Sequence, residues 1–362
     1  MVSRTMKSLL EHLEYNYAML GQEDIPVDNI APINKGKTSN LSFCSSDDHK
    51  GLESILNSKS GIILCKKTLV NSIREKISIN NSIPKLYVFV DNPRHVFIKI
   101  AKLMRAPKDN KIGISKHAII SDSAKIGRDC YIGDFTIIGD ECIIGDNVIV
   151  DSRVVLKNST VGNKCILQSG SVIGEDGFAF ERDKIDMKLE KFPHYGKVII
   201  ENEVEIFASC SIARGSIRNT VVEEGTKIDA LCHIAHNVHI GKNTQVTAGV
   251  VVGGSTNIGK NCWLGLNSTI KHKIKIGDNV IVGSGSSVIH DVDDKDIVAG
   301  TPAKSIKNKI TISEDKLFLM GGQIYNKENQ QQRDTLWKKD HFIKQNGLVF
   351  LNFLIGTLLI SH

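Results

Sequence analysis

Aliphatic residues return at almost every sixth position between Ile114 and Val288, and a small residue, often glycine, usually follows each one. The uninterrupted run comprises Val222, Ile228, Ile234, Ile240, Val246, Val252, Ile258, Leu264, Ile270, Ile276, Val282 and Val288. A period of six fits neither the 3.6-residue turn of an α-helix nor the two-residue alternation of a strand. It is typical of a hexapeptide parallel β-helix, a solenoid in which each coil is one repeating unit. We therefore predict a mainly β fold.

The hexad frame is interrupted at three places. It slips by one residue after Leu156, and it slips again between Ile212 and Val222. The longest interruption covers residues 175–197, which carry no hexads. We expect this segment to leave the prism as a loop, and loops on a rigid scaffold are where binding groups concentrate.

The pattern divides the chain into three predicted parts. Residues 1–110 show no hexads and combine short apolar strands with helical patterns, as expected of a small α/β domain. Residues 111–305 form the β-helix, and residues 306–362 form a helical and apolar C-terminal tail. The last apolar run of that tail, residues 348–360, is shorter than the roughly 20 residues that a membrane-spanning helix needs.

Charge and composition indicate which partners and which cellular location to expect. The formal net charge is +6, and basic residues outnumber acidic ones in the C-terminal tail. Such a tail allows peripheral membrane contact or binding of an acidic partner, although a solvated helix fits the same pattern. Because only 6% of the residues are aromatic, no nucleic-acid partner is predicted. The first 25 residues lack the apolar block of a secretory signal, so we expect a cytoplasmic protein.

The eight cysteines indicate packing rather than chemistry. They include no Cys-x-x-Cys pair and no zinc-type spacing, so no metal site is predicted. Six of them fall at the fifth place of a hexad, a slot that takes a small inward side chain: Cys130, Cys142, Cys165, Cys210, Cys232 and Cys262. Phosphate-loop, dinucleotide and nucleophile-elbow motifs are also missing from the sequence, so no bound cofactor is predicted.

The repeat converts sequence spacing into geometry. Three hexads make one triangular coil, so residues 18 apart stack on the same edge, about 4.8 Å apart. His236, Gly254 and His272 share one such column. The two histidines should lie roughly 10 Å apart, which suits a reacting centre at one and a charged substrate group at the other. Gly254 between them would expose a backbone N–H, the donor that an oxyanion in acyl transfer requires. Solvent-exposed polar residues at a coil corner are the alternative interpretation.

Three segments resemble one known family. They are residues 170–178 (Gly-Ser-Val-Ile-Gly-Glu-Asp-Gly-Phe), the pair Ile228-Asp229, and residues 233–238 (His-Ile-Ala-His-Asn-Val). With the hexads, they are similar to the UDP-3-O-acylglucosamine N-acyltransferases of lipid A biosynthesis. The resemblance covers most of residues 30–300. It implies a left-handed parallel β-helix that works as a homotrimer, with active sites between subunits and an N-terminal domain that grips uridine.

The resemblance also assigns roles to individual residues. His236 would be the general base that takes a proton from the 2-amino group of UDP-3-O-acyl-glucosamine, while that amine attacks the thioester of an acyl-acyl carrier protein. Histidine suits proton transfer near neutral pH. Gly254 would supply the oxyanion donor, and His272 would contact the phosphate or sugar of the acceptor. The other expected substrate-binding residues are Asn237, Phe43, His49, Asp176 and Phe178.

Two departures from the family pattern keep alternatives open. The family's aromatic-x-x-Asn-x-x-Tyr uridine motif maps onto Phe43, Ser46 and His49, which preserves the stacking ring and loses the amide and the phenol. Residues 299–304 (Ala-Gly-Thr-Pro-Ala-Lys) are similar to the ending of acetyltransferases that use acetyl-CoA. An N-acyltransferase that uses acyl carrier protein is the favoured hypothesis. The alternatives are an acetyl-CoA-dependent acetyltransferase acting on a UDP-amino sugar for surface polysaccharide, and a scaffold that has lost catalysis.

Overall fold

The structure, a computed structural model, describes residues 5–13, 15–23, 25–77, 85–104 and 111–307. Its contacts divide the chain into two compact units, Met1–Asn110 and Lys111–His362. Each unit has a hydrophobic core of its own. The expected C-terminal tail lies outside the described residues from position 308 onward.

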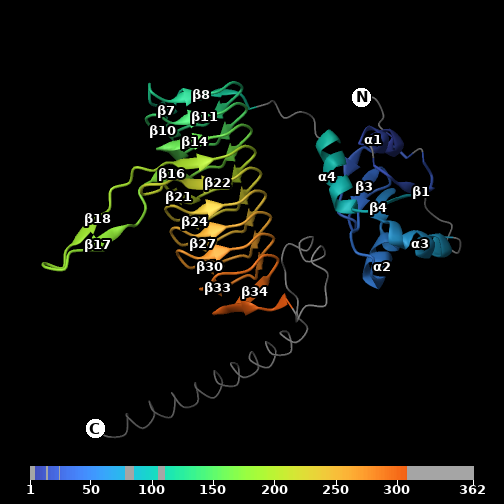
Figure 1. Cartoon of the computed structure of the whole chain (residues 1–362). Coiled ribbons are helices and arrows are strands. Elements are labelled where there is room, and N and C mark those ends of the chain that lie inside the picture. The colour runs from blue at the N-terminus through green and yellow to red at the C-terminus, as the bar shows by residue number, and fades with distance from the viewer. Residues whose placement is uncertain (1–4, 14, 24, 78–84, 105–110, 308–362) are drawn as a thin grey trace, which may run out of the picture. The chain divides into compact units, whose positions relative to one another are not determined.

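The N-terminal unit is a five-stranded sheet covered by helices on both faces (Figure 1). The strands run in the order β1-β5-β4-β3-β2, and only the β1–β5 pair is antiparallel. The strands are β1 (Ala18–Gly21), β2 (Asn29–Ile30), β3 (Asn40–Phe43), β4 (Ile62–Lys66) and β5 (Leu86–Val90). The helices are α1 (Met6–His12), α2 (His49–Asn57), η1 (Lys67–Leu69), α3 (Val70–Ile77) and α4 (Pro93–Met104).

Alternation along the central strands supplies a core on each face of this sheet. Successive side chains of a strand point to opposite faces. In β4, Leu64 packs with residues of α1 and α4, whereas Ile63 packs with residues of α2 and α3. Both side chains are fully buried. The unit is therefore a small α/β fold with helices on either side of the sheet.

The second unit is a prism of three sheets, and the chain visits each sheet once per coil (Figure 1). The first sheet contains β6 (Gly113–Ile114), β9 (Tyr131–Ile132), β12 (Ile149–Val150), β15 (Ile166–Leu167), β20 (Glu205–Ile206), β23 (Lys227–Ile228), β26 (Gln245–Val246), β29 (Trp263–Leu264), β32 (Ile281–Val282), β34 (Ile297–Gly300) and β35 (Ala303–Ser305). The second contains β7 (Ile119–Ile120), β10 (Ile137–Ile138), β13 (Val155–Leu156), β16 (Val172–Glu175), β21 (Ser211–Ala213), β24 (His233–Ile234), β27 (Val251–Val252), β30 (Thr269–Ile270) and β33 (Ser287–Val288). The third contains β8 (Lys125–Ile126), β11 (Ile143–Ile144), β14 (Ser159–Val161), β19 (Val198–Ile200), β22 (Thr220–Val222), β25 (His239–Ile240), β28 (Asn257–Ile258) and β31 (Lys275–Ile276). All pairs in the three sheets are parallel except β34–β35.

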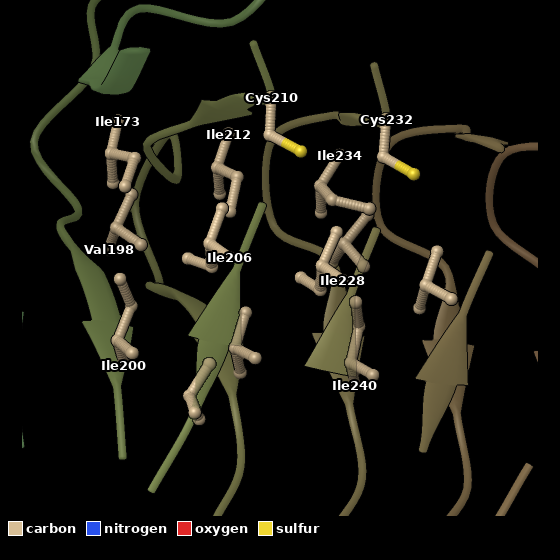
Figure 2. Packing of buried hydrophobic residues seen from close by; sticks show 14 of the residues in the cluster. Ile173, Val198, Ile200, Ile206, Cys210, Ile212, Ile228, Cys232, Ile234 and Ile240 are labelled. Atoms are coloured by element: carbon tan, nitrogen blue, oxygen red, sulfur yellow. The ribbon is translucent and has the colours of Figure 1, made fainter. Parts of the chain in front are cut away.

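The repeating aliphatic residues fill the interior of the prism. Figure 2 shows that equivalent side chains stack from coil to coil, as Ile212 does with Ile234. The cysteines at the fifth place of the hexads are buried and free, so the expectation of core packing is confirmed. Burial raises the pKa of the Cys165 and Cys262 thiols to about 11, which keeps both groups in the unreactive protonated form.

Each coil turns its corners through residues in the left-handed region, and asparagine occupies seven such positions. Asparagine tolerates this conformation better than most side chains, which explains its frequency after the repeating positions. At the corner between the second and third sheets, Asn237 (φ 61°), Ser255 (φ 62°) and Lys273 (φ 59°) take this conformation in successive coils. We call this corner, where the chain passes from a second-sheet strand to a third-sheet strand, the 2–3 corner.

All three interruptions of the hexad frame lie at the 2–3 corner. Pairs such as Ile234 and Val252 lie 18 residues apart. The spacing is instead 17 from Leu156 to Ile173, 39 from Ile173 to Ile212, and 22 from Ile212 to Ile234. The shortened segment follows β13, and the two insertions follow β16 and β21. Chain length therefore varies at one edge of the prism only.

The longer insertion is the loop predicted over residues 175–197. It contains β17 (Phe180–Arg182) and β18 (Leu189–Lys191), which pair antiparallel as a hairpin that projects from the prism (Figure 1). The shorter insertion, residues 214–219, packs against the end of this loop. Tyr195 donates its backbone N–H to Ser216 O (2.6 Å), and Lys197 donates its own to Asn219 Oδ1 (2.8 Å).

Among the helices that the structure describes, none is long and apolar enough to cross a membrane.

Candidate active site

A groove of about 720 Å³ runs along the 2–3 corner. Its prism side is formed by the predicted column, His236, Gly254 and His272. Its other side is formed by the start of the loop, residues 175–180. The insertion after β16 therefore converts an edge of the prism into a cleft.

The tautomer of His236 follows from its hydrogen bonds. Its Nδ1 lies 2.8 Å from Asn237 Oδ1. The Asn237 amide is oriented by two contacts, because its Nδ2 donates to Arg218 O (2.7 Å) and its Oδ1 accepts from Ser216 N (3.2 Å). Since Oδ1 can only accept, His236 Nδ1 must donate to it. The proton of the neutral ring is then on Nδ1, and the lone pair of Nε2 is left for a substrate.

Asn237 is held from its backbone as well as its side chain. Its N–H donates to Thr220 Oγ1 at 2.8 Å, and the Ser216 hydroxyl donates to its Oδ1 at 2.8 Å. The residue is only 6% exposed and has a left-handed backbone. It therefore lies behind the imidazole and fixes its orientation. This differs from the predicted role in substrate binding, because both ends of its amide are already bonded within the chain.

Two glycines enclose the imidazole of His236. A Cβ at Gly254 would lie 2.7 Å from His236 Nε2, and a Cβ at Gly177 would lie 2.6 Å from His236 Cβ. Both separations are shorter than any real side chain allows, so only glycine fits at either position without displacing the ring. Gly177 comes from the loop and Gly254 from the next coil. The ring is thus held between the insertion and the prism.

The backbone of Gly254 differs from that of its neighbours. The N–H groups of Gly253 and Ser255 donate to Ile270 O and His236 O in adjacent coils, at 2.8 and 2.9 Å. No bond of this kind from the Gly254 N–H is found within the described chain. A backbone N–H without such a bond is the type of donor that can stabilise a developing negative charge.

His272 lies one coil beyond Gly254, because Lys273 donates its N–H to Gly254 O at 3.0 Å. Both His272 and Lys273 line the groove. This end of the groove therefore carries a cation and an imidazole, which can bind a phosphate or another anion.

The loop contributes an acidic and an aromatic group. Asp176 contacts Lys191 at 2.5 Å and Arg214 at 4.0 Å, and the Lys191 ammonium holds the pKa of Asp176 below its ordinary value. Phe178 is 87% exposed and its ring centroid lies 5.0 Å from that of Phe180. Asp176 therefore pins the loop as well as lining the groove, whereas Phe178 presents a bare apolar face.

Comparisons with known proteins bear on this groove. The chain is 35% identical to the UDP-3-O-acylglucosamine N-acyltransferase of Saccharophagus degradans over 266 residues, covering 68% of this chain and 73% of that protein. The enzyme of the same name from Coxiella burnetii is 34% identical over 251 residues, covering 64% of this chain and 70% of that protein. The chain belongs to the UDP-3-O-acylglucosamine N-acyltransferase family. The predicted membership is therefore confirmed.

Further matches agree with the fold of this acyltransferase family member. The model for bacterial transferase hexapeptide (six repeats) matches residues 219–254 and 255–290, and the model for the GMPPB C-terminal domain matches residues 114–185. A crystal structure of a UDP-N-acetylglucosamine acyltransferase is 23% identical, with a TM-score of 0.50 over 58% of this chain and 81% of that chain. This likeness concerns the fold alone. The mainly β, left-handed parallel β-helix that was predicted is confirmed.

The structure of this family member brings five predicted residues to one groove: His236, Gly254, His272, Asp176 and Phe178. Phe43 and His49 belong to the N-terminal unit, at the end of β3 and the start of α2. The Phe43 ring packs against Phe97, with centroids 4.7 Å apart, and His49 is exposed. Within the described ranges, no group of three or more His, Cys, Asp or Glu side chains could hold a metal ion.

Some residues of the groove and its support were not predicted. His233 lines the groove, where desolvation lowers the pKa of its imidazole. Ser216 bonds to Asn237, and His194 bonds to Gly177. Ser216 and His194 lie in the two insertions, where the hexad arithmetic gives no position, so only the folded chain could reveal them.

Proposed function

We propose that this chain transfers a 3-hydroxyacyl group from acyl carrier protein to the 2-amino group of a UDP-3-O-acyl-glucosamine, a step of lipid A biosynthesis. The observation that carries the proposal is the His236–Asn237 pair, which leaves Nε2 free beside the amide of Gly254. A base and an oxyanion donor on one edge are what aminolysis of a thioester requires. Membership of the family supports the choice of acceptor and reaction.

In the proposed mechanism, the lone pair of the sugar amine attacks the thioester carbonyl carbon and forms the new C–N bond. The carbonyl oxygen becomes an oxyanion, which the Gly254 N–H stabilises. Nε2 of His236 takes the proton that the nitrogen must lose. The intermediate then collapses, the C–S bond breaks, and the departing thiolate takes the proton from the imidazolium. Asn237 keeps the ring in the correct tautomer throughout.

Recognition of the two substrates is divided among the remaining residues. His272 and Lys273 are proposed to contact a phosphate of the acceptor, because they form the cationic end of the groove. The exposed ring of Phe178 is proposed to contact the acyl group. Phe43 and His49 are proposed to contact the uridine, Phe43 by stacking. No bound cofactor or metal is part of the proposal.

A homotrimer is part of the same proposal. The hairpin and its flanks expose many large apolar side chains: Phe178, Phe180, Ile185, Met187, Leu189, Phe192 and Tyr195. An isolated two-stranded hairpin is marginal in water, so a neighbouring copy that covers these residues would stabilise it. Light scattering at micromolar concentration should report three chains, and a monomer would contradict this part of the proposal.

The cytoplasm is the proposed location. All eight cysteines are free, as expected in a compartment that keeps thiols reduced. Acyl carrier protein would be met there as the donor. The peripheral membrane contact proposed for the C-terminal tail concerns residues outside the described part of the chain.

The decisive experiment is a mass-spectrometric transfer assay. The protein is offered UDP-3-O-acyl-glucosamine with 3-hydroxyacyl-acyl carrier protein, and separately acetyl-CoA with several UDP-amino sugars. We expect a long-chain amide from the first mixture, and acetylation in the second alone would replace the proposal with the acetyltransferase alternative. His236→Ala should lower kcat by about 10²- to 10⁴-fold. The matched control is His290→Ala, which changes an exposed histidine that lies 18 residues after His272 and does not line the groove.

A further inference from the structure

His194 stands near the end of the loop and is almost completely enclosed. Only 8% of its surface is exposed. Its Nε2 accepts a hydrogen bond from the Gly177 backbone N–H at 3.2 Å. Its Nδ1 is buried and has no hydrogen-bond partner among the described residues. Because Nε2 accepts, the proton of the neutral ring must sit on Nδ1.

The bond from Gly177 to His194 bears directly on the base. Gly177 is so close to His236 that an added Cβ would overlap its Cβ. The His194 ring also approaches the His236 ring itself, with centroids 6.1 Å apart and planes at 83°. A displacement of His194 would therefore release both the backbone and the ring that confine the imidazole of His236.

The residues that follow His194 reach the other side of the same base. Tyr195 and Gly196 donate their N–H groups to Ser216 O at 2.6 and 3.1 Å. Ser216 in turn donates to Asn237 Oδ1, the acceptor of the His236 proton. Three consecutive residues of the loop thus reach both supports of His236, Gly177 directly and Asn237 through Ser216.

We propose that His194 is a positioning residue, which closes the loop onto His236 by accepting the Gly177 N–H and so fixes the imidazole for proton transfer. This inference rests on the proposed function. A buried donor without a partner is uncommon in native structures and calls for a specific explanation. The enclosed Nδ1–H of His194 is such a donor, and the hydrogen bond that His194 makes through Nε2 goes to Gly177 beside His236.

The first test distinguishes the effect of the hydrogen-bond acceptor of His194 from the effect of its aromatic ring. His194→Phe keeps an aromatic ring beside His236 and removes the acceptor, whereas His194→Gln keeps an acceptor near the position of Nε2. We expect His194→Phe to lower kcat by about 10- to 100-fold with KM changed by less than about threefold, because misplacing a catalytic group costs that much. His194→Gln should restore most of the loss. His290→Phe is the control for a histidine-to-phenylalanine change outside the groove.

Full activity in His194→Phe would overturn the inference, and so would equal losses in the phenylalanine and glutamine variants when both stay folded by circular dichroism. A second measurement needs no activity. Nitrogen NMR of the full-length protein labelled at histidine should show His194 and His236 both protonated on Nδ1 and bare on Nε2 in the neutral form. A proton on Nε2 of His194 would also overturn the inference. If the wild type transfers no acyl group, the proposed function fails while this tautomer test still decides whether His194 accepts the Gly177 N–H.

Discussion

The backbone and the side chain of Asn237 have separate roles. Its backbone turns the coil corner at φ 61°, and its amide orients His236. Glycine reaches the same backbone conformation without strain, so Asn237→Gly removes the amide alone. We expect a folded protein whose kcat is roughly 10- to 100-fold lower, because the imidazole loses its orienting acceptor. Steady-state kinetics with the carrier-protein substrate measures this.

The control for that variant is Asn243→Gly. Asn243 has the same left-handed backbone (φ 55°) at another corner and does not line the groove. It should lose little activity. Equal losses in the two variants would mean that the backbone flexibility that glycine adds at a corner, and not loss of the amide, lowers kcat.

Gly254 is the second residue whose identity is dictated by the base. The Cβ of an alanine there would lie 2.7 Å from His236 Nε2, so the ring or the coil must shift. Gly254→Ala should therefore lower kcat by about 100-fold or more, since both the base and the oxyanion donor move. Gly139→Ala is the milder change elsewhere in the prism, because its Cβ would lie 3.1 Å from Lys157 Cγ and 3.3 Å from Leu156 O. Comparable losses of kcat in both variants would mean that an added methyl group disturbs the prism in general and not the His236 site in particular.

The sequence predicts which individual residues share an edge only where the hexad repeat is unbroken. The 18-residue spacing predicted that His236, Gly254 and His272 share an edge, and all three line one groove. Their chemical roles remain predictions. Neither His194 nor Ser216 could be placed in this way, because the contacts of a non-repeating segment depend on where it folds back.

At the scale of elements, an ion pair helps to hold the two ends of the loop together, and we call this connection the clasp. Asp176 at its start meets Lys191 at the end of β18, at 2.5 Å. Asp176→Asn should loosen the hairpin, and trypsin should cleave within residues 180–191 several times faster at neutral pH. Asp186→Asn is the control, because the Asp186–Lys188 pair lies within the hairpin tip and joins no distant segments. Identical cleavage rates in the two variants would contradict a clasp.

The same pair predicts a dependence on pH. Lys191 depresses the pKa of Asp176 in the folded chain, so the contribution of this pair is present above the ordinary pKa of aspartate, about 3.9. It is lost as the pH falls through the depressed value. Hydrogen exchange of the hairpin amides should therefore show constant protection from neutral pH down to about pH 4 and a loss below it. Loss of protection near pH 6 would mean that a histidine, and not the Asp176–Lys191 pair, holds the hairpin in place.

For the whole molecule, the two units carry separate cores and should unfold separately. Ile234 is fully buried in the prism, and Leu64 is fully buried in the N-terminal unit. Ile234→Ala should lower the unfolding free energy of the prism by about 2–5 kcal/mol. Hydrogen exchange should show faster opening of the prism alone, and Leu64→Ala should do the reverse. Equal effects on both units would show that they unfold as one.

The six-residue period of the prism could be predicted from the spacing of its residues, whereas the hand of the coil and the oligomeric state could not. Hexads such as Ile228, Ile234 and Ile240 require three faces with inward aliphatic side chains, and this follows from spacing alone. The hand of the coil came from the resemblance, since a six-residue period is compatible with either hand. The oligomeric state also came from the resemblance, because a single chain does not specify which exposed surface another copy covers.

The confinement of every insertion and deletion to the 2–3 corner has an evolutionary consequence. A residue added within a strand would turn the inward side chains outward, so such changes would be eliminated by selection. Changes after β16 or β21 leave the stack of coils intact, and the segment after β16 forms one wall of the groove while the segment after β21 packs against it. Descendants of this gene can therefore explore new acyl donors or sugars by altering the length of two surface segments. His236, Gly254 and His272 need not change.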